Sequence, residues 1–128
     1  MAAAGLRSGQ RGQSTVELAL ALPLLLTVAL FIVQVGLVVR DQVRTVQAAR
    51  EGVRAAAVDA RGGAARRAAL ASAGLEGDRT RVAVGGRGGP GSRVEVRVTY
   101  RAATDVPLVG AFVPDLVLVA AATMRVEA

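Results

Sequence analysis

The 128-residue sequence predicts an α+β fold, in which a long N-terminal transmembrane helix continues into an amphipathic helix packed on a small antiparallel β-sheet. Leu18–Val39 carries no charged side chain, apolar residues then recur at three- and four-residue steps, and two later stretches alternate apolar and polar residues. We therefore divide the chain into a leader (residues 1–12), a transmembrane helix (13–39), an amphipathic helical extension (40–61) and a small α+β region with about three antiparallel strands (62–128).

The uncharged run is long enough to cross a bilayer. A helix over Leu18–Val39 extends roughly 33 Å at about 1.5 Å per residue, and the hydrocarbon core of a bilayer is about 30 Å thick. The alternative is a secretory signal peptide, whose apolar core of about 7–15 residues precedes a small-residue cleavage site. Here the run continues into Arg40 and Asp41 without such a site. We favour a single-pass anchor in the lipid bilayer.

Composition restricts the function classes. The chain contains no cysteine and no histidine, which excludes a disulfide framework and removes the commonest general base and metal ligand. The net charge of +6 comes from arginines spread along the chain, and aromatic residues, on which single-strand binders stack bases, make up 2%. We expect no nucleic-acid partner. No nucleophile lies at a defensible spacing from a base, so we expect no catalytic residues, cofactor, metal site or enzymatic activity.

The segment Gly12-Gln13-Ser14-Thr15-Val16-Glu17 lies directly before the apolar run. Ser14 and Glu17 have the spacing of a capping box, with Ser14 as N-cap, and a carboxylate at this position suits the helix dipole. The residues before it, Met1–Arg11, are small, polar and basic, and predict a disordered cytoplasmic leader. A helix cap is therefore one role for Glu17, and it is compatible with the second role described next.

The same segment resembles the type IV prepilin motif, in which a peptidase cuts after a glycine and a glutamate stands fifth in the mature chain. The resemblance makes Gly12 and Gln13 the cleavage site and Glu17 the assembly glutamate. Glycine suits such a site because it has no side chain to obstruct the peptidase. Cutting would create an ammonium group at Gln13, one helical turn from Glu17, and a carboxylate at a membrane edge is costly unless it is paired.

The chain as a whole resembles the TadE-like minor pilins, the pseudopilins of the bacterial tight-adherence (Tad/Flp, type IVb) secretion system. The resembling stretches are RGQSTVELALALPLLLTVALF, QAAREGVRAAAV and AAATMRVE. The resemblance implies a pilin-like fold and a part in pilus assembly. It implies as partners a prepilin peptidase, the major Flp pilin, other minor pilins, inner-membrane platform proteins and an assembly ATPase. Gln13 departs from type IVa pilins, which begin with an aromatic residue. An uncleaved single-pass scaffold is the alternative function.

Orientation is the point on which two signals disagree. Arg7 and Arg11 precede the apolar run, whereas Arg40, Arg44, Arg50 and Arg54 follow it. Counting these charges favours a cytoplasmic C-terminal side. The prepilin motif requires a cytoplasmic N-terminus and an extracytoplasmic C-terminal region at the membrane or cell surface. We follow the motif, because acidic residues are mixed among the following arginines.

Within and after the apolar run, further patterns predict local structure. Pro23 predicts a tolerated kink, and Gln34 and Gly36 mark either a helix–helix contact or a plain helix end. The apolar stripe predicted to pack on the domain is Val39, Val43, Val46, Ala49, Val53 and Ala57, with the helix ending near Arg61-Gly62-Gly63.

Ala64–Ala73 predicts a second helix stopped by Gly74. Strands are predicted at Arg81–Gly85, Arg93–Arg101 and Leu116–Glu127. The intervening G-x-G-x-x-G lacks a following helix, so nucleotide binding is not expected. A second span over Val106–Met124 is disfavoured because Pro107, Pro114 and Asp115 interrupt it.

Overall fold

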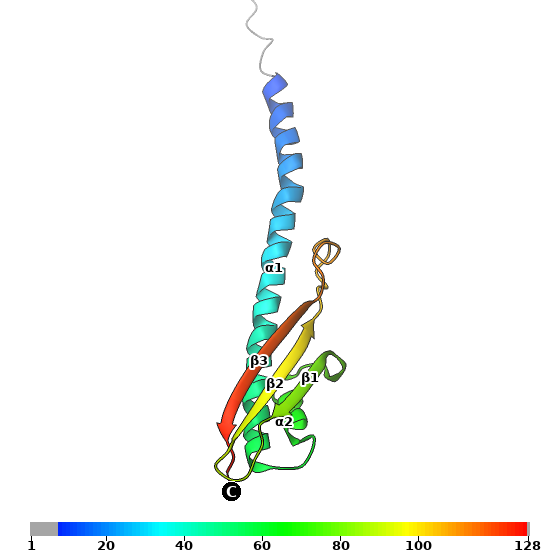
Figure 1. Cartoon of the computed structure of the whole chain (residues 1–128). Coiled ribbons are helices and arrows are strands. Elements are labelled where there is room, and N and C mark those ends of the chain that lie inside the picture. The colour runs from blue at the N-terminus through cyan, green and yellow to red at the C-terminus, as the bar shows by residue number, and fades with distance from the viewer. Residues whose placement is uncertain (1–7, 128) are drawn as a thin grey trace, which may run out of the picture.

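The computed structural model describes residues 8–127, with side chains from Gly12 onward. The elements in chain order are α1 (Ser8–Val58), α2 (Ala64–Ala73), the 3-10 helix η1 (Gly77–Arg79), β1 (Thr80–Gly85), β2 (Arg93–Ala102) and β3 (Leu116–Arg125). Helix α1 runs the length of the molecule, and the other elements pack beside its C-terminal half (Figure 1). The predicted α+β architecture, a long apolar helix followed by a short helix and a three-stranded antiparallel sheet, is confirmed.

Helix α1 begins earlier than the sequence pattern predicts. Residues 8–11, expected to be part of a disordered leader, continue the helix, whereas residues 1–7 of that leader lie outside the described residues. The glutamine and arginine of this segment are good helix formers, and each residue added to an existing helix costs little. Ser14 therefore lies inside α1, and its predicted position as N-cap is wrong for the uncut chain.

Helix α1 ends at Val58, just before the predicted Arg61-Gly62-Gly63. An Asp59 carboxylate oxygen accepts hydrogen bonds from the backbone N–H of Arg61 at 2.8 Å and from its Nε at 3.0 Å. This local turn competes with further helix. The side chain of Arg87 donates to the backbone carbonyl of Asp59, and the N–H of Glu127 donates to the carbonyl of Ala57. The end of α1 is thereby tied to the β1–β2 connection and to the segment after β3, which lie at the same end of the sheet.

The hydrogen bonds from Arg61 lower the pKa of Asp59 from its usual 3.8 to about 2. Because the folded-state pKa lies below the unfolded one, the ionised carboxylate stabilises this corner above pH 3.8 and loses that effect as the pH falls through about 2. We expect Arg61→Gln to move the pKa back toward 3.8. Carboxyl chemical shifts of Asp59 against pH, recorded by NMR in detergent micelles, test this. Equal midpoints for wild type and variant would contradict it.

Helix α2 has the predicted bounds and the predicted glycine stop. Gly74 adopts a left-handed conformation with φ of 60°, and its N–H donates to the carbonyl of Leu70 at 3.2 Å. The sheet has strand order β1-β2-β3 with antiparallel pairing throughout, as in Thr80 opposite Tyr100 and Val98 opposite Ala120. Because β2 rather than a helix follows the glycine-rich connection, the context of a dinucleotide fingerprint is missing.

The core lies between the two helices and one face of the sheet. Val94, Val96 and Val98 of β2 are fully buried, in the predicted alternation. Small residues let the helices approach closely, and the core residues that the two helices contribute are Ala48, Ala49, Val53, Ala56, Ala57, Ala65, Ala69 and Ala73. The opposite face of the sheet is exposed.

The predicted apolar stripe of α1 is only partly correct. Ala49, Val53 and Ala57 are buried, but Val39 and Val43 are exposed. The row of α1 that packs on the domain instead includes Ala48 and Gly52, because close approach to α2 and the sheet requires small residues. A three- and four-residue repeat does not decide which of two neighbouring apolar rows faces the domain.

Candidate functional site

Gly12, Gln13 and Glu17 lie close together at the N-terminal end of α1, and all three are exposed. Glu17 follows Gln13 by about one helical turn, which places the two on the same side of the helix. A Cβ atom added at Gly12 would meet nothing within 4 Å. Glycine inside a helix costs roughly 0.5–1 kcal/mol relative to alanine. The packing of the described residues therefore gives no reason for a glycine at this position.

Glu17 lies among apolar side chains at the start of the uncharged run. Val16, Leu18 and Leu20 beside it are exposed. Between Gly12 and Glu127, the ion pairs join Asp59 to Arg61, Glu76 to Arg79 and Glu95 to Arg97, and none reaches Glu17. A positively charged partner for this carboxylate has to come from outside the described residues. The structure brings the three predicted site residues together, and the cut and the pairing stay predictions.

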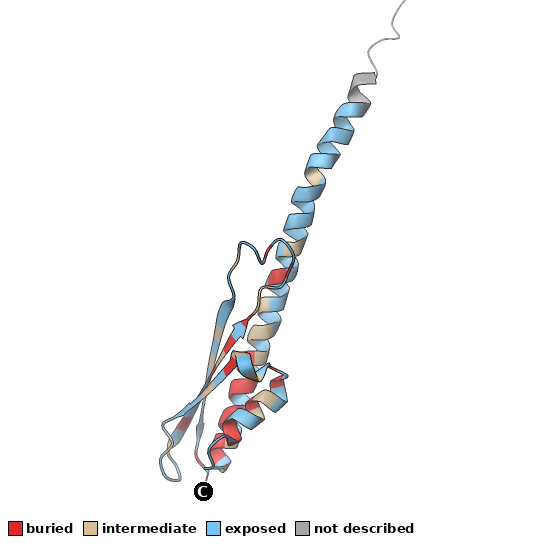
Figure 2. Cartoon of the chain, turned by 90° about the vertical axis from the view of Figure 1, so that its right-hand side faces the viewer, coloured by how far each residue is buried: buried red, intermediate tan, exposed pale blue. Residues whose placement is uncertain are grey.

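The rest of the apolar run forms a rod that projects beyond the domain (Figure 2). Its large apolar side chains, among them Leu24, Leu25 and Ile32, are exposed. Pro23 lies inside the helix, which continues through it. The Thr27 hydroxyl donates to the carbonyl of Pro23 at 2.8 Å, so this polar hydrogen is satisfied within the helix. Among residues 8–127, α1 is the one helix with the length and composition to span a bilayer, which suggests a single-pass membrane anchor.

Gln34 is the exception on this rod, because it is only 4% exposed. The β2–β3 loop (residues 103–115) folds back against α1 at this level (Figure 2). Gln34, Val113 and Leu116 line one cavity of about 160 Å³ between helix and loop. Gln34 therefore contacts the chain's own loop, and its Oε1 is buried without a hydrogen-bond partner. Gly36, the other candidate contact residue, has open space around it.

The outer face of the sheet is strongly basic, a feature that the sequence pattern alone did not reveal. The strand register gathers on it Arg81, Arg93, Arg97, Arg101 and Arg125. Arg97 pairs with Glu95 at 3.3 Å. Alternation in β2 predicts which residues face outward, but only the pairing of β2 with β3 brings Arg125 opposite Arg93. The missing information was the register between strands distant in sequence.

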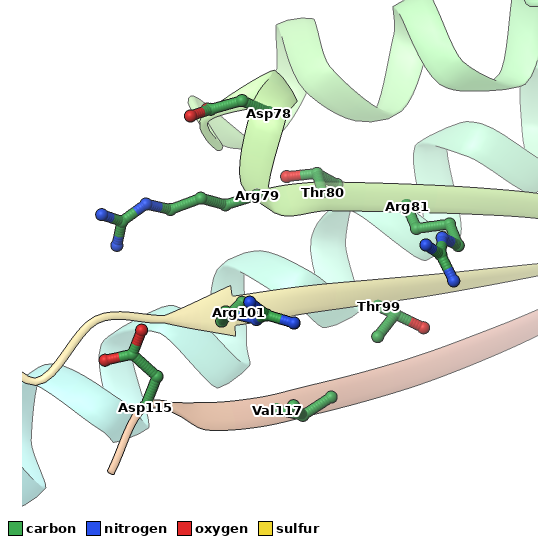
Figure 3. A pocket seen from close by; sticks show the side chains of 8 residues that line it. All are labelled: Asp78, Arg79, Thr80, Arg81, Thr99, Arg101, Asp115 and Val117. Atoms are coloured by element: carbon green, nitrogen blue, oxygen red, sulfur yellow. The ribbon is translucent and has the colours of Figure 1, made fainter.

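An open depression of about 560 Å³ lies at the end of this face nearest the β2–β3 loop (Figure 3). Its lining residues are Asp78, Arg79, Thr80, Arg81, Thr99, Arg101, Asp115 and Val117. Arg81 and Arg101 extend from adjacent strands, and Asp115 lies beside Arg101 (Figure 3). Guanidinium groups can bind phosphate, but acidic and basic groups alternate here. Across residues 12–127, no three acidic side chains form a group that could hold a metal ion.

Comparison with known proteins adds one similarity. The family model described as TadE-like protein matches residues 12–54. The matched segment begins at Gly12, contains the whole apolar run and ends in the part of α1 that packs on the domain. No curated protein and no solved structure matched the chain. The N-terminal helix is thus similar to that of the TadE-like proteins, as its motif predicts, and this similarity suggests a Tad pilus-associated protein.

Proposed function

We propose that this chain is a minor pilin (pseudopilin) of a Tad/Flp type IV pilus system. In this proposal α1 anchors it in the membrane, a prepilin peptidase cuts after Gly12, and Glu17 holds the mature subunit in the assembly. The observation that carries the proposal is that Gly12 and Glu17 neither pack nor pair within the described residues, although each is costly where it stands. Recognition by other proteins accounts for both. The family similarity, which opens at Gly12, supports the same reading.

Cleavage would change the chemistry of the helix start. Removing residues 1–12 leaves Gln13 with a free ammonium group and leaves the first backbone N–H groups of the new helix without partners. Ser14 and Glu17 then stand in the first turn, where the capping box excluded for the uncut chain becomes available. In the fibre, the Glu17 carboxylate pairs either with the N-terminal ammonium group of its own chain or with that of a neighbouring subunit.

The domain formed by α2 and the sheet lies at the other end of α1 and faces the extracytoplasmic side in this proposal. Its role is to contact the major Flp pilin and other minor pilins. The peptidase, the platform proteins and the assembly ATPase act on the membrane-embedded part. No enzymatic step is assigned to the chain, in keeping with the absence of histidine and cysteine from its sequence.

The mature N-terminus is the decisive measurement. The protein is isolated from its host membrane and its N-terminal sequence and intact mass are determined. A chain starting at Gln13 supports the proposal. A chain that retains residues 1–12 on every molecule overturns it in favour of an uncleaved membrane-anchored scaffold. That alternative has one observation on its side, because α1 runs unbroken through Gly12 and a peptidase would have to unwind it there.

We expect Glu17→Ala to leave the cut intact but to lower recovery of the protein in sheared surface fractions by about tenfold or more. Removing one partner of a buried ion pair costs about 3–5 kcal/mol because the other charge stays unpaired. Glu51→Ala is the matched control, since Glu51 is an exposed acid on the same helix beyond the apolar run. Equal recovery of Glu17→Ala and Glu51→Ala would contradict the assembly role.

A further inference from the structure

We propose that the β2–β3 loop inserts into the leaflet of the bilayer on the side of the sheet, next to α1, as a second and non-spanning membrane contact. The proposal requires only that α1 spans the membrane and holds whether or not the chain is a pilin. Residues 106–114 of the loop, VPLVGAFVP, contain no charged side chain. None of the described residues covers the tip of the loop, where Phe112 is 87% exposed and Leu108 is 58% exposed.

The position of the loop along α1 indicates what covers it. Val113 and Leu116 line the same cavity as Phe31, Gln34 and Val38. These α1 residues belong to the uncharged run that ends at Val39. Phe31 lies roughly 12 Å before Val39 along the helix axis. If the run fills the hydrocarbon layer, the loop lies within the same layer and its exposed apolar side chains continue the lipid-facing surface of α1.

The loop satisfies several of its own backbone groups, as hydrocarbon requires. The N–H of Gly110 donates to the carbonyl of Val106 at 2.9 Å, and the N–H groups of Phe112 and Val113 both donate to the carbonyl of Val109 at 3.0 Å. Pro107 and Pro114 have no N–H to satisfy. The Thr104 N–H donates to an Asp115 carboxylate oxygen at 3.2 Å and closes the base of the loop. This internal bonding suits a water-poor surrounding.

The backbone conformation of Leu108 also supports a contact between the loop and lipid. It has φ of 67°, the left-handed region that costs a non-glycine residue energy. A glycine there would avoid that cost, and the leucine instead presents an apolar side chain to the surroundings. Gly110 holds the tight turn, since an added Cβ would lie 2.5 Å from the carbonyl oxygen of Thr104. Strain retained at an exposed apolar side chain indicates a contact made outside the chain.

Two neighbouring features fit a bilayer as the partner. The loop covers Gln34, an amide that would otherwise face lipid within the apolar run. Arg101, in the strand that leads into the loop, and Arg81 beside it line the basic depression at the loop-proximal end of the sheet (Figure 3). This end of the sheet is level with the end of the apolar run, because the Gln42 side chain donates to the carbonyl of Val119 at 3.5 Å. The arginines thus lie at the height of the lipid phosphates.

Tryptophan fluorescence tests the insertion directly, because the chain contains no tryptophan. The full chain with Phe112→Trp is reconstituted into phosphatidylcholine–phosphatidylglycerol vesicles, with Thr123→Trp as the control at an exposed position near the far end of β3. We expect acyl-chain-brominated lipid to quench Phe112→Trp several times more than Thr123→Trp, and aqueous acrylamide to show the opposite order. Leu108→Trp is a second reporter on the same loop and should behave as Phe112→Trp does.

Two outcomes would overturn the proposal. In the first, acrylamide quenches the fluorescence of Phe112→Trp as strongly as that of Thr123→Trp, and brominated lipid quenches neither. This result would place the loop in water. In the second, the fluorescence of Phe112→Trp is protected from both quenchers, and this protection is lost when the protein-to-lipid ratio of the vesicles is lowered. That result would identify a neighbouring protein copy as the partner. Cleavage after Gly12 has no bearing on any of these readouts, so failure here is separable from failure of the proposed function.

Discussion

Valine in place of Gly12 is expected to leave the chain at its precursor length in cells that process the wild type to a start at Gln13. The reason lies outside the packing of the described residues, because among them a Cβ atom added at Gly12 meets nothing within 4 Å. A peptidase whose site fits a residue without a side chain would be obstructed by the branched side chain of valine. Intact mass of the protein recovered from membranes distinguishes the two lengths.

Gly36→Val is the matched control for this substitution. Gly36 is also a glycine of α1, is also exposed, and also has open space at its Cβ position. Its conversion to valine should leave processing at the wild-type level. A mature-size band from Gly12→Val would show that the cleavage site is wrongly assigned. Loss of processing in both variants would instead attribute the effect to a general disturbance of α1 in the membrane.

The sequence predicted those parts of the fold that depend on near neighbours. The alternation through Val94, Val96 and Val98 requires only the two-residue period of a strand, and β2 has that face buried. Helix α2 is bounded by glycines, and its observed ends match the prediction. The length of the uncharged run likewise predicted a helix long enough to span a bilayer, and the structure has a continuous helix there with exposed apolar side chains. In each case the controlling interaction lies within a few residues of the pattern that revealed it.

The features that the sequence did not reveal depend on contacts between distant segments. Nothing near Gln34 in sequence indicates that Val113 would approach it, and its burial follows from the path of the β2–β3 loop. The basic outer face requires the register that places Arg125 opposite Arg93. The early start of α1 has a different cause, which is local: the polar residues before Gly12 have no apolar period to mark them as helical, yet they extend an existing helix at little cost. For the candidate site itself, the sequence supplied all three residues, and the structure added that the fold does not explain the glycine.

Gly52 is the glycine of α1 whose absence of a side chain the fold does explain. A Cβ atom there would lie 3.1 Å from Cγ1 of Val96, 3.3 Å from the carbonyl oxygen of Ala65 and 3.5 Å from Cβ of Ala69. It therefore sits where α1 meets both α2 and the sheet. We expect Gly52→Val to lower the free energy of unfolding of the domain by about 2–4 kcal/mol, since extra carbon atoms in a filled core typically cost about 1–3 kcal/mol and a branched side chain adds strain.

Gly36→Val, compared with Gly52→Val, separates the effect of core packing from the effect of helix propensity. Both substitutions replace a glycine inside α1, so both gain the same intrinsic helix propensity, but only Gly52 has neighbours at close range. Urea unfolding of the full chain in detergent micelles, followed by circular dichroism, should therefore show a loss for Gly52→Val and none for Gly36→Val. Because the closest atom belongs to Val96, the double variant Gly52→Val with Val96→Ala should recover part of the loss. Equal stability of the two single variants would mean that α1 does not press against β2 as described.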